Sequence, residues 1–156
     1  MVQSQLLPRV SGIVIAALTV NCLVGSANAQ QVIAICGASK GKAFYLEPTK
    51  EGWVDDGISN GTITFLRNPS GDYDILVKSA GPAFSARGDG AQVVKVHGAD
   101  ESIITLIVIY PLHVTEVYQL TLNANGRGTL IWSNLKNRSA PMGITRGAVF
   151  VAECSR

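Results

Sequence analysis

The chain has 156 residues, of which 47% are hydrophobic and only 15% are charged, and its formal net charge is +2. It has neither the basic excess nor the clustered basic face that nucleic-acid binding through phosphates requires, so we expect no nucleic-acid partner. The plentiful apolar residues exclude a largely disordered chain, and the length fits one domain of ordinary size.

The N-terminal segment has the organisation of a secretory signal peptide. An uncharged stretch from Val10 to Val24 is followed by Ala27 and Ala29, which give the small-x-small pattern that signal peptidase reads. The stretch is shorter than the roughly 20 apolar residues of a membrane-spanning helix. We predict cleavage after Ala29, giving an exported domain of residues 30–156 with no membrane span. The competing interpretations are a retained anchor and a lipoprotein modified at Cys22.

Two cysteines remain after this cleavage, Cys36 and Cys154, one near each end of the mature chain. Two cysteines in an exported protein most simply pair. The bond would close nearly the whole domain into one loop, which contributes on the order of 4–5 kcal/mol in the chain-entropy model. Because no Cys-x-x-Cys spacing is present, we predict a structural disulfide and no redox chemistry.

The mature chain is a succession of short apolar and β-branched runs separated by turn residues, without a convincing helical stripe. The predicted strands are Val32–Cys36, Ala43–Glu47, Thr62–Arg67, Tyr73–Lys78, Phe84–Arg87, Gln92–His97, Ile103–Tyr110, Val114–Leu122, Thr129–Ser133 and Gly147–Cys154. The connections are too short for parallel crossovers, which predicts an antiparallel meander of about 8–10 strands. Closure as an up-and-down barrel would hide the sheet edges and bring the two cysteines together, and a β-sandwich is the alternative.

The motif most suggestive of chemistry is Gly37-Ala38-Ser39-Lys40-Gly41, which matches the G-x-S-x-G nucleophile elbow. In hydrolases this serine lies between a strand and a helix, whereas here two short strands flank it. Neither His97 nor His113 is placed by local sequence near Ser39. We therefore interpret the segment as a glycine-rich hairpin turn and predict no catalytic residues. The spacing of histidines and carboxylates predicts no metal site, and nothing indicates a cofactor.

Four residues are candidates for binding: Trp53, Asp55, Asp56 and Glu116. The first three lie in the least strand-like stretch, Pro48 to Asn60, where the tryptophan either plugs one end of a barrel or lines a binding surface. Glu116 interrupts an apolar strand face. It is a paired structural carboxylate, a group that orients a ligand, or the sign of a bulge that turns it outward.

The mature chain resembles a group of small exported bacterial proteins without an assigned activity. The resemblance is carried by Cys36–Gly41, Phe44–Glu47, Gly52–Trp53, Asp56–Ser59, Tyr73–Leu76, Tyr110–Pro111 and Cys154. It implies a periplasmic or extracellular setting and carries over no catalytic residues. Size, strand number and export are also similar to those of lipocalin-type barrels and small periplasmic lysozyme inhibitors, a likeness of architecture alone.

Three classes of function follow. We expect first a non-catalytic binding or inhibitor-type module with an envelope or extracellular protein as partner. The alternative is a β-barrel carrier of a small ligand, whose interior Tyr118, Phe44 or Trp53 would line. The third is a hydrolase built on Ser39.

Overall fold

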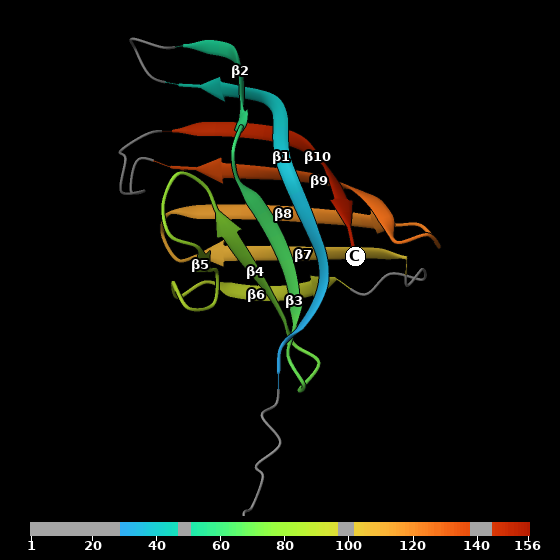
Figure 1. The fold of residues 1–156 in the computed structure, drawn as a ribbon. Helices are drawn as coiled ribbons and strands as arrows, with labels where there is room; N and C mark the ends of the chain where they lie inside the picture. The colour runs from blue at the N-terminus through green and yellow to red at the C-terminus, as the bar shows by residue number, and fades with distance from the viewer. Residues whose placement is uncertain (1–28, 47–50, 97–101, 138–144) are drawn as a thin grey trace, which may run out of the picture.

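The computed structural model describes residues 29–46, 51–96, 102–137 and 145–156, and these residues form ten strands and no helix (Figure 1). The strands are β1 (Gln31–Tyr45), β2 (Gly52–Ile58), β3 (Thr62–Arg67), β4 (Tyr73–Lys78), β5 (Phe84–Ser85), β6 (Gln92–Val96), β7 (Ile103–Tyr110), β8 (Val114–Leu122), β9 (Arg127–Lys136) and β10 (Arg146–Ser155). The all-β prediction is confirmed. His97, the last residue of one predicted strand, lies outside the described residues.

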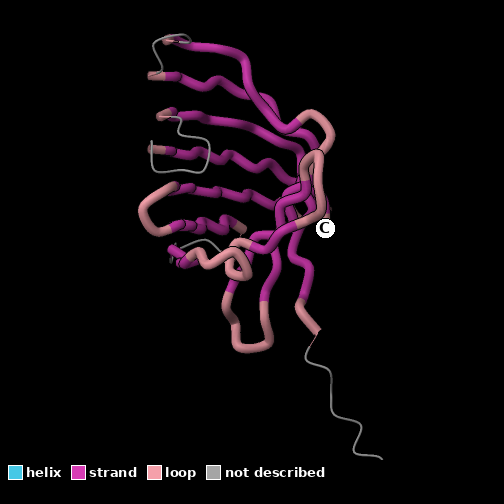
Figure 2. The backbone as a smooth tube through the Cα atoms, turned by 90° about the vertical axis from the view of Figure 1, so that its left-hand side faces the viewer, coloured by secondary structure: helices cyan, strands magenta, loops and turns pink. Residues whose placement is uncertain are grey.

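All ten strands belong to one antiparallel sheet with the order β5-β4-β3-β1-β10-β9-β8-β7-β6, to which β2 adds by pairing with β1. The strands β6 to β10 form a meander, and the sheet then continues through β1. Seen from the side, the sheet curls into a half-barrel (Figure 2), and β3 and β4 cross in front of the meander in the view of Figure 1. The predicted neighbourhood of the first and last strands is confirmed, because β1 and β10 pair along most of their length.

Strand β1 has 15 residues and pairs with three other strands. One edge pairs with β10, while the other pairs with β3 up to Cys36 and with β2 from Ser39 onward. The prediction of two strands joined by a hairpin turn at Gly37–Gly41 is therefore wrong. The glycines serve a bend within one strand: a Cβ on Gly41 would collide with the backbone of β10 at the Val149 carbonyl oxygen.

Strand β2 lies within the stretch from Pro48 to Asn60 that looked least strand-like in the sequence, and that interpretation is wrong for Gly52–Ile58. The side chains of Val54, Asp56 and Ile58 point to the partly buried inner side, and Trp53 and Asp55 point outward. Because β2 has polar residues on both of its faces, its sequence lacks the alternation of apolar and polar residues that marks a half-buried strand. Pro48 lies outside the described residues.

The interior of the half-barrel is filled by side chains. Phe65 of β3 meets Tyr118 of β8 edge-to-face at 6.2 Å between ring centroids, and Trp132 stacks between Tyr118 and Phe150 at 5.6 and 4.3 Å. The other large, fully buried apolar side chains come from β3, β4, β7, β8 and β9: Ile63, Ile75, Leu106, Val108, Leu120 and Leu130. Both halves of the curled sheet therefore share one core.

The two ends of the sheet, β5 with β4 on one side and β6 on the other, approach without forming a ladder. Arg87 bridges them: its Nε donates to the carbonyl oxygen of Tyr73 at 2.7 Å and its Nη2 to that of Val93 at 2.8 Å. The buried carboxylate of Asp74 fixes this arginine by accepting a hydrogen bond from the Arg87 backbone N–H at 3.1 Å and another from the Ser85 hydroxyl at 2.6 Å. Lys95 of β6 adds a second contact across this seam, with its Nζ over the ring of Tyr73 at 5.2 Å from the centroid.

A disulfide joins Cys36 of β1 to Cys154 of β10, which confirms the predicted staple. Such a bond is typical of proteins that fold in an oxidising compartment. The described residues contain no helix that is long and apolar enough to cross a membrane. Residues 1–28 lie outside the described residues, so cleavage after Ala29 stays a prediction.

Candidate functional site

The four binding candidates lie on opposite faces of the sheet. Trp53 and Asp55 are on the outer face of β2, whereas Asp56 lies on its inner face together with Glu116 of β8. Adjacent residues of a strand point to opposite sides, so the two aspartates, which look equivalent in the sequence, have different surroundings.

On the outer face, Trp53 is 67% exposed and meets Phe44 of β1 edge-to-face, at 5.3 Å between ring centroids. It does not fill the interior, so the interpretation of Trp53 as a plug is wrong. Asp55 beside it pairs with Lys42 at 2.6 Å, and both side chains are largely exposed. The outer side of β2 therefore presents an aromatic ring next to a neutralised pair of charges.

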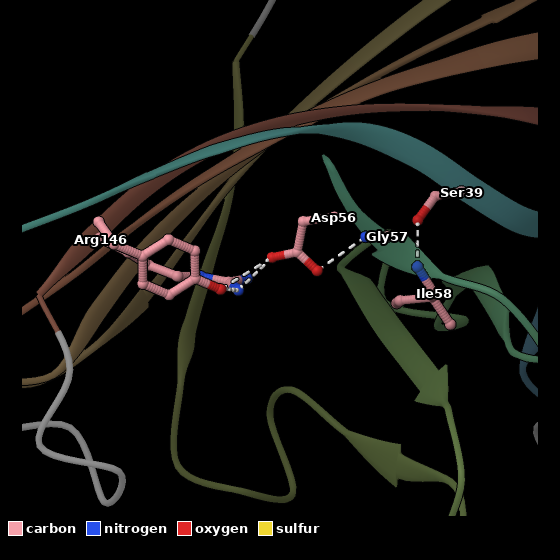
Figure 3. A network of polar contacts seen from close by, with 6 residues as sticks. Ser39, Asp56, Gly57, Ile58 and Arg146 are labelled. Atoms are coloured by element: carbon pink, nitrogen blue, oxygen red, sulfur yellow. Dashed lines mark hydrogen bonds and ion pairs between the residues drawn. The ribbon is translucent and has the colours of Figure 1, made fainter. Parts of the chain in front are cut away.

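On the inner face, Asp56 is the centre of a network that ties β2 to the sheet (Figure 3). Its Oδ2 accepts a hydrogen bond from Arg146 Nη1 at 2.5 Å, and the Tyr45 hydroxyl lies 3.2 Å from the same oxygen. Its Oδ1 accepts from the Gly57 backbone N–H at 2.8 Å. The arginine and aspartate side chains are only 16% and 24% exposed, which makes this pair a partly buried one.

Glu116 faces inward as well, since the ladders of β8 with β7 and β9 run without a register shift. The interpretation of Glu116 as a sign of a bulge is therefore wrong. The Tyr118 hydroxyl donates to its Oε2 at 2.7 Å. Burial raises the pKa of Glu116, while that hydrogen bond and the charges of Lys136 and Arg146 oppose the rise. Burial, and then the neighbouring charge of Arg146, lower the pKa of Lys136.

These residues, with Asn134 and Trp132 of β9, form what we call the inner polar cluster: Tyr45, Asp56, Glu116, Tyr118, Trp132, Asn134, Lys136 and Arg146. Ladder pairs place them on neighbouring strands, for example Asn134 beside Glu116, and Lys136 beside Arg146. Trp132 Nε1 and Asn134 Oδ1 are buried and have no hydrogen-bond partner in the described part of the chain. The cluster covers one end of the core with hydrogen bonds and one internal ion pair.

Sequence reasoning named Asp56 and Glu116 separately. It missed Lys136 and Asn134, because the predicted strand ended at Ser133. The alternation of Leu130, Trp132 and Asn134 on one face would have indicated the longer strand.

The outer face of the sheet carries an apolar patch, which we call the outer patch: Val117 of β8, Ile131 and Leu135 of β9, and Val149 and Val151 of β10. Their exposed fractions run from 38% to 68%. Ile131 and Val151 are direct ladder partners, Val117 and Val149 lie on either side of Ser133, and Leu135 lies between Thr115 and Gly147, so the patch spans three neighbouring strands. The solvent side of an antiparallel sheet is ordinarily polar, and contiguous exposed apolar residues mark interaction sites.

Beside the outer patch lies an open groove of about 1100 Å³. It forms where Gly37 and Ala38 of β1 leave the ladder with β10: Cys36 pairs with Cys154, but Ser39 pairs with Ala152. This is one extra residue in β1, a β-bulge. The groove is lined by Ile35, Gly37, Ala38, Lys40, Asn123, Arg127, Gly128, Thr129 and Val151–Ser155.

The serine of the G-x-S-x-G motif lies under this bulge. Ser39 is buried, and its Oγ accepts a hydrogen bond from the Ile58 backbone N–H at 3.1 Å, at the end of the β1–β2 ladder (Figure 3). Of the two histidines, His113 lies in the turn between β7 and β8, and His97 is outside the described residues. No group of three or more histidine, cysteine or acidic side chains that could hold a metal ion occurs within the described ranges.

Comparison with family models, with curated proteins and with solved structures gave no match.

Proposed function

We propose that this protein is an exported, non-catalytic binding module that engages a partner protein through the outer face of its sheet. The observation that carries the proposal is the outer patch: five exposed aliphatic side chains on three adjacent strands, at the centre of a rigid sheet. Desolvating such a patch favours association, because burial of apolar area is the main driving force of protein–protein contact.

The filled interior makes a carrier of small ligands the weaker candidate. Of the three aromatic side chains expected to line a ligand cavity, Tyr118 is packed between Phe65 and Trp132, while Phe44 and Trp53 meet on the outer face. A lipocalin-like carrier needs these rings around one empty space. The Ser39 hydroxyl faces the end of β2, which gives a hydrolase no supporting geometry.

The experiment is capture of a partner by the immobilised mature domain from an envelope extract of the source cells. The variant Ile131→Ser with Val149→Ser should reduce capture at least tenfold, because both side chains lie in the outer patch. The matched control is Val32→Ser with Phe84→Ser, two apolar side chains of similar exposure outside it. Equal capture by both double variants, each with an unchanged melting temperature, would overturn the proposal.

A further inference from the structure

Three charged side chains line the groove at the β1 bulge, and the register of the sheet gives their order along β10. Arg127 on β9 is the ladder partner of Ser155, Glu153 lies two residues along β10, and Lys40 on β1 is the partner of Val151. All three side chains are exposed on the outer face and line the groove. The groove therefore presents a positive, a negative and a positive charge, each about 7 Å further along β10.

None of these three charges forms an ion pair with another described residue, whereas Lys42 and Arg146 each have a carboxylate. Two apolar side chains that are nearly half exposed, Ile35 and Val151, also line the groove, together with the polar side chains of Thr129 and Ser155. Gly37 and Ala38 are exposed and lie outside the ladder pairs of β1 with β10, β2 and β3.

From this arrangement we infer that the groove binds an extended peptide segment of the partner with the pattern acidic-x-basic-x-acidic. Alternate side chains of an extended chain project from one face at about 7 Å intervals, which matches the step of the three charges along β10. Each charge also lies one strand further across the sheet, about 5 Å away, a distance that the long arginine, glutamate and lysine side chains can span. The segment would cross β10 diagonally, with its acidic residues on Arg127 and Lys40 and its basic residue on Glu153. The inference rests on the proposed function. It states which part of the partner protein would bind at the groove, which adjoins the outer patch because Val151 belongs to both.

The direct test uses the mature domain and two labelled seven-residue threonine peptides, measured by fluorescence anisotropy at low salt. One peptide has glutamate at its second and sixth positions and lysine at its fourth, and the other has the charges inverted. We expect the first to bind at least tenfold more tightly, with affinity that falls as salt is added. Equal affinity for the two peptides would overturn the inference.

Two variants test where the peptide binds. A Cβ built on Gly37 meets no atom within 4 Å, so Gly37→Phe should fold and fill the groove; Gly81 is equally open and lies in a different loop, which makes Gly81→Phe the matched control. We expect the affinity to fall at least tenfold for the first variant and to stay unchanged for the second. Equal binding by both variants would place the peptide elsewhere and refute the inference.

A charge swap tests the order of the charges. Lys40→Glu, Arg127→Glu and Glu153→Lys combined should reverse the preference, so that the inverted peptide binds more tightly. An unreversed preference overturns the inference. The proposed function is tested separately. If the outer-patch variant loses partner capture but peptide binding does not depend on charge, the protein is still a binding module, and the groove is not its binding site.

Discussion

Replacing either of two adjacent aspartates by asparagine should affect stability very differently. Asp55 pairs with Lys42 where both side chains are more than half exposed, and such surface pairs contribute about 0.5 kcal/mol or less. Asp56 pairs with Arg146 where both are less than a quarter exposed. Removing one partner of a fully buried pair costs about 3–5 kcal/mol, so for this partly buried pair we expect about 2–3 kcal/mol.

At about 3 °C per kcal/mol for a domain of this size, Asp56→Asn should lower the melting temperature by about 6–9 °C, while Asp55→Asn should lower it by less than about 2 °C. Thermal unfolding followed by circular dichroism, together with urea titration, measures both. A repeat in about 1 M salt, where the Debye length is about 3 Å, should erase the small Asp55 effect and leave most of the Asp56 effect. Equal destabilisation by the two variants would refute the assignment of Asp56 to the partly buried side of β2.

Four further predictions follow. Burial raises the pKa of Glu116 above its ordinary value of 4.5, so the folded state retains a proton that the unfolded chain releases. The stability gained in this way is lost as the pH rises through the raised pKa. The urea midpoint of unfolding, measured from pH 4.5 upward, should therefore decline less for Glu116→Gln than for the unsubstituted protein. Leu112 has φ of 69° in the turn between β7 and β8, and Leu112→Gly should stabilise the domain by about 0.5–1 kcal/mol in urea unfolding, against the usual cost of a glycine substitution. Replacing Cys36 and Cys154 by alanine opens a loop with a sequence separation of 118 and should destabilise the domain by about 4–5 kcal/mol, measured against the oxidised protein. Intact mass of the exported protein should correspond to a chain that begins at Gln30, and a mass that includes the apolar N-terminal stretch would contradict cleavage.

Much of the fold could be predicted because its strands are bounded by strong turn signals. The predicted strands Thr62–Arg67, Tyr73–Lys78, Ile103–Tyr110 and Val114–Leu122 have the observed bounds. The first two are separated by the turn residues Asn68–Asp72 and the other two by a short turn that begins at Pro111, and their apolar residues face a shared core. Local sequence predicts the bounds of a strand correctly where the turn residues at its ends and the apolar residues along one face indicate the same segment.

The errors arose where glycine or aspartate has a role that depends on tertiary structure. Gly41 looks like a turn residue, but it is required by the close approach of β10, which the sequence around it does not reveal. Asp56 looks like a solvent-exposed loop carboxylate, and its inward direction depends on Arg146, a residue 90 positions away. The candidate site shows the same limit: polar residues could be named one by one, but their grouping is set by sheet order.

The position of β1 in the sheet has a consequence for how the protein folds. The first strand to be synthesised lies in the interior of the sheet and pairs with the last strand, β10, along its length. Until the final residues are available, β1 can pair only with β2 and β3, and β6 to β9 can form a separate meander. The contacts between β1 and β10 then close a loop with a sequence separation of 118 at the disulfide. A topology with such distant partners folds slowly. We expect the nascent chain to stay open until its synthesis is complete, a state suited to passage across a membrane before folding.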